Sequence, residues 1–276
     1  MAVAADTIEH VVAAALAEDV GEGDVTTAAT VDPGAVGAAA LLVQEPGVVF
    51  GLAVVEAVFR AVDSEVEVEP LIEDGARLDT PAAVARVTGP LGAILTGERV
   101  ALNFLGRLSG VATLTRRYAD AVAGTGVAIL DTRKTTPGLR LLEKQAVVAG
   151  GGRNHRFGLD DGVLIKDNHL RAAGSMAFAV ERARAATDLP VEVECDTLGQ
   201  VSEALAAGAD AILLDNMPLD ELRAAVELVA GRARLEASGG ITLDDVRAVA
   251  ETGVDEISIG ALTHTARSLD VSLEIT

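Results

Sequence analysis

The sequence predicts an α/β protein in which a small α+β unit is followed by an incomplete, open (β/α) barrel of the TIM type. Within about the first 108 residues there are several short valine-rich runs bounded by Gly, Pro and Asp, a pattern that is typical of strands. From residue 127 onward, apolar runs alternate with alanine-rich helical segments. Runs buried on both faces that alternate with amphipathic helices indicate a parallel sheet covered by helices.

The N-terminal part is predicted to be a small sheet with helices packed on it. A helix is expected over 7–17, followed by the turn-rich stretch GEGDVTT, and a second helix over 52–62. Strands are expected at 36–43, 47–51, 65–70 and 82–89. Residues 97–124 have helical spacing over roughly six turns, with a break expected near Gly110.

The C-terminal part is predicted to contain six strands. They are VAILDTRK, GVLIKDNH, VEVECD, AILLDN, RLEASGG and EISIGA, and helices are expected at 139–149, 175–187, 198–207, 219–230 and 242–252. Thr242 followed by Asp245 is typical of a helix start. A doubly wound open sheet is the alternative, but no GxGxxG motif follows a strand, which disfavours it.

Composition excludes several classes of protein. The chain has 22 basic and 42 acidic residues, a net charge of -20, which argues against binding nucleic acid or anionic membrane surfaces. No apolar run is long enough to span a membrane, and no signal peptide is expected. Cys195 is the single cysteine, so no internal disulfide can form, which predicts a cytoplasmic location.

Ionisable and glycine residues follow the predicted strands, at the edge where barrel enzymes carry their chemistry. They are Arg133, Lys134, Lys166, Asp167, Asn168, His169, Glu194, Asp196, Asp215, Asn216, Ser238, Gly239, Gly240 and Gly260, with Arg153 to Arg156 in the loop before the second strand. Each alone is explained equally well as a solvated charge, a helix cap or a turn. Together they predict one site with complementary charges.

The residue types indicate a ligand that carries phosphate. The SGG and IGA stretches offer backbone N–H groups without side-chain bulk, and the predicted helix after SGGITLDD points to the same phosphate. Glu194 and Asp215 supply oxygens that suit Mg²⁺. A second, multiply anionic ligand would suit the basic residues of this list, which are Arg133, Lys134, Arg153, Arg156 and Lys166.

Several long stretches resemble the quinolinate phosphoribosyltransferase family, also called carboxylating nicotinate-nucleotide diphosphorylases. They are ALAEDVGEGDVTT, QEPGVVFG, GERVALNFLGRLSG, DTRKTTPGLR, LEKQAVVAGGGRNHRFGLDDGVLIKDNH, LDN, ASGGI and ISIGALTH, which span nearly the whole chain. The resemblance implies that quinolinate and phosphoribosyl pyrophosphate react, with Mg²⁺, to give nicotinate mononucleotide, pyrophosphate and CO₂ on the de novo route to NAD.

The resemblance also implies the architecture and the assembly. It implies an α/β sandwich domain over 1–108, joined by the tail 268–276, and an open α/β barrel over 109–267. A homodimer is expected in which the neighbouring subunit completes each active site, with a hexamer as the alternative assembly.

Residue roles follow from the same resemblance. Arg99, Arg133, His155, Arg156 and Lys166 are expected to bind quinolinate, with Arg99 donated across the dimer interface. Lys134, Ser238, Gly239, Gly240, Gly260 and His264 are expected to bind phosphoribosyl pyrophosphate. Lys134, Glu194 and Asp215 are the expected catalytic residues, and the two carboxylates are expected to hold Mg²⁺ directly or through water. Asp167, Asn168 and His169 are expected to orient Lys166.

Three alternatives remain at this point. One is a molybdenum-transport-associated pyrophosphorylase homologue of the same family, and another is a non-catalytic barrel that binds a phosphate ligand. The third is nicotinate phosphoribosyltransferase, whose substrate carries one carboxylate and would need fewer cations. The full cationic set and the carboxylates Glu194 and Asp215 favour the dicarboxylate and the metal-dependent reaction.

Overall fold

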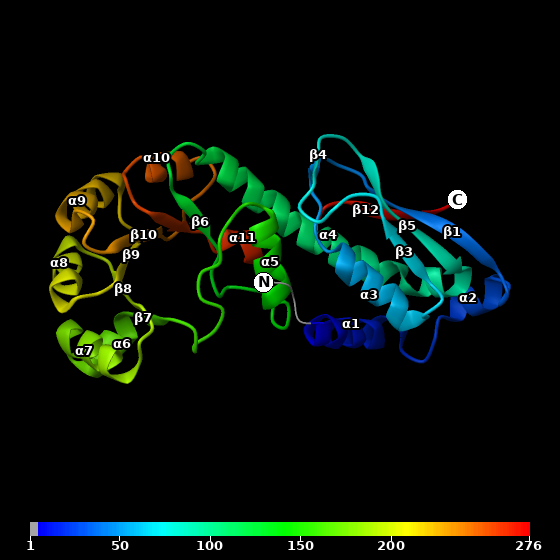
Figure 1. Ribbon diagram of the computed structural model, residues 1–276, viewed down its shortest axis with the longest axis horizontal. Helices are drawn as coiled ribbons and strands as arrows, with labels where there is room; N and C mark the ends of the chain where they lie inside the picture. Colours follow the sequence, from blue (N-terminus) through cyan, green and yellow to red (C-terminus); the bar gives the residue numbers. More distant parts are fainter. Residues whose placement is uncertain (1–4) are drawn as a thin grey trace. The chain divides into compact units, whose positions relative to one another are not determined.

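A computed structural model describes residues 5–276, and for Ala5 and Asp6 it describes the backbone alone (Figure 1). The chain divides into two compact units. The first unit comprises residues up to Arg116 together with Thr135–Gly150 and Thr263–Thr276, and the second comprises Arg117–Lys134 and Gly151–Leu262. The boundary between Arg116 and Arg117 lies inside a helix.

The first unit contains a four-stranded antiparallel sheet in the order β12-β1-β5-β3. Its elements are α1 (Ala5–Val20), α2 (Val25–Thr30), β1 (Val36–Val43), β2 (Gly47–Val48), α3 (Leu52–Val62), β3 (Glu67–Pro70), β4 (Arg77–Leu78), β5 (Ala82–Pro90), most of α4 (Leu91–Ala121), α5 (Arg140–Ala149) and β12 (Val271–Ile275). In Figure 1, α3 and α4 run along the sheet. The C-terminal strand β12 pairs with β1, so the end of the chain belongs to the N-terminal sheet.

Helix α4 corrects the expected break near Gly110, because it runs without interruption from Leu91 to Ala121. The glycines of this helix serve close packing instead. A Cβ on Gly110 would overlap the carbonyl oxygen of Arg267, and a Cβ on Gly106 would lie 2.8 Å from the carbonyl oxygen of Leu269. The glycines therefore let the C-terminal segment lie directly against the helix on its way to β12.

Short elements of the first unit depart from the sequence-based expectation. The expected strand at 47–51 pairs only over Gly47–Val48, with β4. The turn-rich stretch GEGDVTT ends in α2, because the Asp24 carboxylate accepts the backbone N–H groups of Thr26 and Thr27 and so caps the helix. Helix α3 begins and ends where its periodicity predicts.

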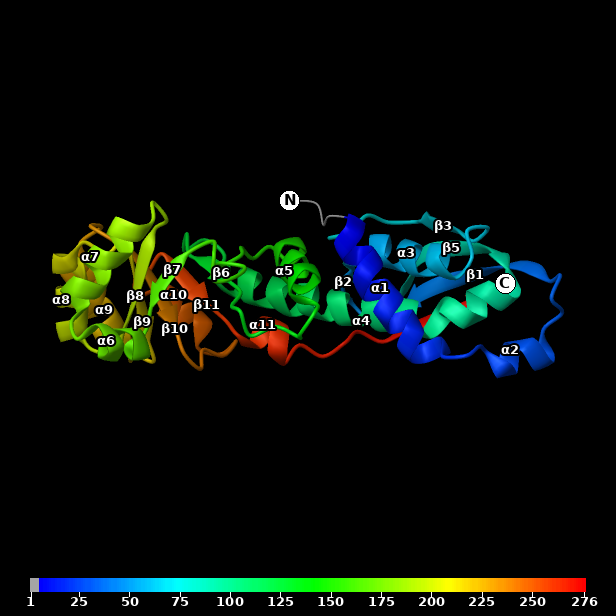
Figure 2. The ribbon, with the colours of Figure 1, turned by 90° about the horizontal axis from the view of Figure 1, so that it is seen from below.

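The second unit contains the six predicted strands as one parallel sheet, in the order β6-β11-β10-β9-β8-β7. Its elements are β6 (Ala128–Leu130), β7 (Val163–Ile165), α6 (Asp167–Ala173), α7 (Met176–Ala186), β8 (Val191–Cys195), α8 (Leu198–Ala207), β9 (Ala211–Asp215), α9 (Leu219–Val229), β10 (Arg234–Ser238), α10 (Val246–Ala250), β11 (Glu256–Ser258) and the first residues of α11 (Ala261–His264). Figure 2 shows α6, α7, α8 and α9 outside these strands.

The strand order confirms the open barrel and excludes the doubly wound alternative. From β7 to β11 each strand pairs with the next one along the chain, so the order contains no switch point. A closed barrel would also pair β6 with β7, but in the described part of the chain these two strands are the edges of the sheet. One isolated bridge, between Leu130 and Arg153, connects β6 to the segment that precedes β7.

The helix expected over 242–252 is wrong in extent. Helix α10 covers only Val246–Ala250, after a turn in which the Thr242 hydroxyl donates to the Asp245 carboxylate at 2.5 Å. Helix α6, which starts directly after Lys166, was not expected. No helix among residues 5–276 combines the length and the apolar character that crossing a bilayer requires.

Candidate active site

A cavity of about 630 Å³, here called the rim cavity, lies at the C-terminal ends of the barrel strands. Its lining residues are Thr132, Arg133, Lys134, His155, Arg156, Leu164, Lys166, Glu194, Leu213, Asp215, Asn216, Glu236, Ser238, Gly239, Gly240 and Ser258. Every strand of the sheet contributes to it, either directly or through the residues that follow. Most of the side chains expected at the site from the sequence are therefore brought together.

The cations of the rim cavity come from segments that follow or precede strands. Arg133 and Lys134 follow β6, where the backbone N–H of Lys134 donates to the Thr132 hydroxyl at 3.0 Å. The Arg156 guanidinium donates to the carbonyl oxygen of Gly162 at 3.0 Å. Burial, and after it the neighbouring charge of Arg133, lower the pKa of Arg156. An anion bound between these groups would relieve their repulsion.

Lys166 stands directly after β7 and pairs with Glu194, with Nζ and Oε2 2.5 Å apart. Its backbone N–H donates to Nδ1 of His169 at 3.0 Å, so His169 contacts the residue that it was expected to orient. Asp167 and Asn168 lie close by but contact Arg171 instead. The Lys166 ammonium therefore reaches the rim cavity already neutralised in part by a carboxylate.

The Ser238–Gly240 turn begins at the last residue of β10 and lines the rim cavity without side-chain bulk from its glycines. Gly239 has φ +101°, and a Cβ there would lie 2.9 Å from the backbone nitrogen of Asn216 and overlap its side-chain oxygen. The Asn216 N–H donates to the Ser238 carbonyl oxygen at 2.8 Å. Close approach of these two strand ends requires glycine at position 239. The five-residue helix α10 is too short to support the expected helix-terminus contact.

The carboxylates of the rim cavity stand on neighbouring strands. Glu194 lies near the end of β8 opposite Leu213 of β9, and Asp215 ends β9. The Asp215 carboxylate accepts a hydrogen bond from the Asn216 side chain at 2.8 Å, and Glu194 accepts from Lys166. Two carboxylates that line one cavity offer hard oxygen ligands of the kind that Mg²⁺ prefers. Glu194 forms an ion pair with Lys166, whereas Asp215 has no ion pair with a cation among the described residues.

Some expected site residues are not brought to the rim cavity. Arg99 and His264 lie in the first unit, on α4 and at the end of α11, and both are exposed. Gly260 follows β11 in the second unit but is outside the lining, which Ser258 enters instead. Arg153 lies in a different cavity. The roles of Arg99, Gly260 and His264 stay predictions.

Sequence reasoning missed several acidic residues of this region. Asp131 is fully buried and accepts the backbone N–H of His155 at 3.0 Å, which ties the loop before β7 to the end of β6. Glu192 and Glu236 are buried inside the barrel, next to the His155 ring. A carboxylate in the middle of an otherwise apolar strand, as in VEVEC and RLEAS, is the signal that could have found the latter two.

These features define a class: an α/β protein with an open barrel whose rim combines clustered cations, a glycine turn and two carboxylates. Residues 24–109 match the family model for the N-terminal domain of quinolinate phosphoribosyl transferase, and residues 111–274 match its C-terminal domain. The chain belongs to the quinolinate phosphoribosyltransferase family, as the resemblance predicted.

Relatives support this membership over the full length of the chain. A nicotinate-nucleotide pyrophosphorylase (carboxylating) of Mycobacterium leprae is 45% identical over 281 residues, which cover 99% of this chain and 97% of that protein. A Bacillus subtilis protein named "Probable nicotinate-nucleotide pyrophosphorylase [carboxylating]" is 45% identical over 261 residues, or 94% of this chain and 90% of that protein. The solved nicotinate-nucleotide pyrophosphorylase of Francisella tularensis is 37% identical, with a TM-score of 0.96 over 100% of this chain and 98% of that one.

Proposed function

We propose that this enzyme transfers the phosphoribosyl group of phosphoribosyl pyrophosphate to N1 of quinolinate and releases CO₂. The products are nicotinate mononucleotide and pyrophosphate, a step in de novo NAD biosynthesis. The observation that carries this proposal is the rim cavity, where Arg133, Lys134, Arg156 and Lys166 meet. In a chain with 22 basic and 42 acidic residues, such a cluster indicates a multiply charged anionic substrate.

Quinolinate is a dianion, and its two adjacent carboxylates need more than one cation. Arg133 and Arg156 are the guanidinium groups of the rim cavity, and a guanidinium binds a carboxylate through two parallel hydrogen bonds. Lys166 is held at the cavity by its ion pair with Glu194. We assign these three cations to the carboxylates of quinolinate.

We assign phosphoribosyl pyrophosphate to the remaining polar residues of the rim cavity. The turn of Ser238, Gly239 and Gly240 offers backbone N–H groups to the 5′-phosphate, and Lys134 lies in the same cavity to neutralise pyrophosphate. Asp215, with Glu194, would hold Mg²⁺, which supplies charge neutralisation for the departing pyrophosphate. Because Glu194 already pairs with Lys166, Asp215 is the principal candidate ligand.

The residues of the chain act by binding and orientation. N1 of the pyridine ring bonds to C1′ of ribose while the bond from C1′ to pyrophosphate breaks, and pyrophosphate keeps the electron pair. The ring is then cationic, so the bond from C2 to its carboxylate breaks with the electrons left on C2, which takes a proton from solvent. Burial, with Asp196 and Glu194 adding repulsion, raises the pKa of Cys195 to about 12, so its thiol is no nucleophile.

We further propose a homodimer in which Arg99 enters the partner's active site, with a hexamer as the alternative. Arg99 is exposed on α4, as an interface residue of an isolated chain would be. An R99A variant and a K134A variant should each be inactive, whereas mixed dimers contain one intact site. Mixing equal amounts should restore about a quarter of wild-type activity. Additivity of the two residual activities would contradict the shared site.

One assay tests the reaction itself. The purified protein is given phosphoribosyl pyrophosphate, Mg²⁺ and either quinolinate or nicotinate, and CO₂ and nicotinate mononucleotide are measured. CO₂ and mononucleotide in equal amounts from quinolinate are expected. Mononucleotide from nicotinate alone would indicate nicotinate phosphoribosyltransferase. No product from either would leave the molybdenum-transport-associated homologue and the non-catalytic barrel.

We also propose a cytoplasmic location, on the ground of the single, unpaired cysteine.

A further inference from the structure

A second cavity, here called the inner cavity, is lined mainly by residues from the first halves of the barrel strands and has a volume of about 380 Å³. Glu192, Arg234, Glu236 and Glu256 line it from the strands, and residues 153–157 line it from the loop before β7. His155, Arg156 and Glu236 line the rim cavity as well. These three residues therefore separate the two cavities.

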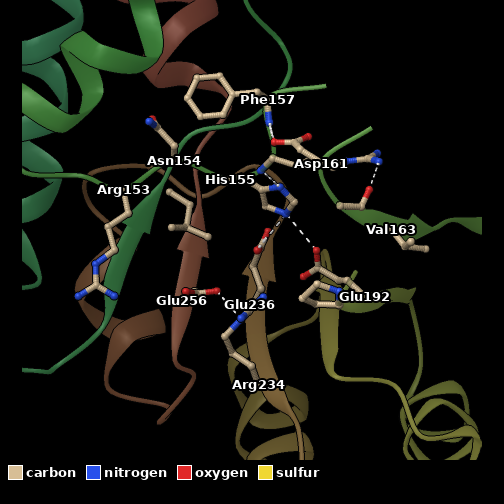
Figure 3. Close-up of a pocket in the computed structure, with 14 residues that line it drawn as sticks. Arg153, Asn154, His155, Phe157, Asp161, Val163, Glu192, Arg234, Glu236 and Glu256 are labelled. Carbon is tan, nitrogen blue, oxygen red and sulfur yellow. Dashed lines mark hydrogen bonds and ion pairs between the residues drawn. The ribbon is translucent and has the colours of Figure 1, made fainter. Parts of the chain in front are cut away.

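His155 is held from several sides. Figure 3 shows its ring directed at Glu192 and Glu236, with Nε2 3.0 Å from Glu192 Oε2 and 3.4 Å from Glu236 Oε2. On the other side of the ring, Nδ1 accepts the backbone N–H of Arg156 at 2.7 Å. The backbone N–H of His155 donates to Asp131. The ring thus links the interior of the barrel to the backbone of Arg156.

These bonds fix the tautomer of the ring. Nδ1 accepts a hydrogen bond from the backbone N–H of Arg156, so Nδ1 carries no proton. The proton is on Nε2, where the Glu192 carboxylate accepts it. Both nitrogens of His155 are therefore engaged within the protein, and the expected binding of quinolinate by His155 stays a prediction.

Burying the carboxylates of Glu192 and Glu236 lowers the stability of the fold, and their negative charge lies close to a cavity that is proposed to bind an anion. Glu236 is 1% and Glu192 5% exposed, and neither Oε1 of Glu192 nor either carboxylate oxygen of Glu236 has a hydrogen-bond partner among the described residues. Interior positions of α/β barrels are usually filled by branched apolar side chains. Replacing buried charges by apolar groups is often neutral or stabilising. Buried carboxylates beneath a pocket for a dianion therefore need a functional explanation.

We infer that Glu192 and Glu236 are positioning residues for the phosphoribosyl transfer. By holding the His155 ring at Nε2, they fix the backbone of Arg156, which is bonded to Nδ1 of the same ring. This places the Arg156 guanidinium where it can bind the carboxylates of quinolinate. The inference rests on the proposed function and concerns the same site. Glu192 makes the shorter contact and is the principal partner of the ring. Glu236 approaches the same nitrogen at 3.4 Å and lines both cavities.

The same three side chains could also hold a metal ion, since one ligand atom from each lies within 4.8 Å of the others. The hydrogen bonds disfavour this. A metal at Nε2 would require the proton to move to Nδ1, which would then face the Arg156 N–H and break the 2.7 Å bond. The geometry accordingly favours a proton between His155 and Glu192.

The central experiment compares two substitutions at one position. Glu192→Leu removes the acceptor for the His155 proton, whereas Glu192→Gln keeps an acceptor oxygen of similar reach. The leucine variant should raise KM for quinolinate about tenfold, and the glutamine variant should stay within about threefold of wild type. KM for phosphoribosyl pyrophosphate should change little in either, because Arg156 is assigned to quinolinate.

Glu256→Leu is the matched control. Glu256 lines the same cavity and pairs with Arg234 at 2.7 Å, without a contact to His155 among the described residues. It should leave KM for quinolinate unchanged. Equal losses in the two leucine variants, or a Glu192→Leu variant with only a lower melting temperature, would overturn the positioning role. Because these comparisons need an active wild type, a wild type that releases no CO₂ from quinolinate defeats the proposed function instead.

A measurement on the wild-type protein completes the test and does not depend on variants that fold. In ¹⁵N-histidine-labelled protein, NMR should show His155, identified by its loss in His155→Asn, as the neutral ring protonated on Nε2. A ring protonated on Nδ1 would contradict the inference. So would one equivalent of a divalent metal that survives dialysis against EDTA and is lost in Glu236→Gln, because the cluster would then be a metal site.

Discussion

The rim cavity and the inner cavity are built on the same strands but differ in where their charges come from. In the rim cavity, the cations Arg133, Lys134 and Arg156 come from loops. In the inner cavity, the carboxylates Glu192 and Glu236 come from the strands themselves. Strand β8 contributes to both cavities, because Glu192 lines the inner cavity and Glu194, two residues later, lines the rim cavity.

The different origin of the charges suits the two cavities to different tasks, which are substrate binding at the rim and the positioning of a side chain in the interior. Loop cations are partly exposed and can approach and release an anion, as substrates require. Strand carboxylates are fixed by the sheet and buried, so they have little freedom and suit the holding of another side chain. The comparison indicates that substitutions at the rim should change substrate binding, whereas substitutions in the interior should act through His155 or through stability.

The largest effect is expected at the rim. Arg133→Ala should leave the fold intact and lower kcat/KM for quinolinate about 30-fold, or ~2 kcal/mol, because a charge-assisted hydrogen bond to a carboxylate is lost. Steady-state kinetics with each substrate varied in turn would measure it. Arg184→Ala is the control, since Arg184 pairs with Asp210 on the outside of the barrel. Equal kinetics for the two variants would remove Arg133 from the site.

A smaller effect is expected at the phosphate turn. Gly239→Ala would place a Cβ against Asn216 at a φ of +101°, which should raise KM for phosphoribosyl pyrophosphate about tenfold and lower stability by ~1–3 kcal/mol. Gly240→Ala is the matched control, because φ there is +60° and a Cβ would meet nothing within 4 Å. Kinetics and thermal unfolding of both variants would test this. Identical losses would show that backbone strain alone, without the clash, explains the effect.

The buried carboxylate of Glu236 should make the stability of the protein depend on pH. Burial, and then the charge of Glu192, raise the pKa of Glu236 to about 7. The stabilisation from the protonated form is therefore complete below the ordinary value of 4.5 and is lost as pH rises through about 7. Glu236→Gln stays neutral, so its melting temperature should gain on wild type between about pH 5 and pH 8. A difference that is constant with pH would contradict the shift.

Charges outside both cavities provide the baseline. Glu251 pairs with Arg247 on the surface of α10 at 2.6 Å, and both side chains are half exposed. Glu251→Gln should change the free energy of unfolding by less than about 0.5 kcal/mol and leave the kinetics unchanged. A larger loss, measured by denaturant unfolding, would mean that exposed pairs contribute more than the comparison assumes.

Much of the architecture could be predicted because it rests on local patterns. The helix over 52–62 and all six barrel strands follow from periodicity and from apolar runs bounded by polar residues. The break at Gly110 was wrong because the glycine serves a contact with residues distant in sequence, which periodicity cannot reveal. The helix over 242–252 was wrong in extent because the bond between Thr242 and Asp245 stabilises a turn where a helix start was expected.

By itself, the sequence determined the family, the number of barrel strands and the residues that stand at their ends. Those follow from the order of residue types along the chain, because parallel strands place their C-terminal ends at one edge. The sequence predicted an open barrel, but only the tertiary structure decided that the opening lies between β6 and β7 and that Glu192 and Glu236 meet His155. The physical reason is that strand pairing and side-chain direction depend on residues far apart in the chain, and local propensity carries no information about them.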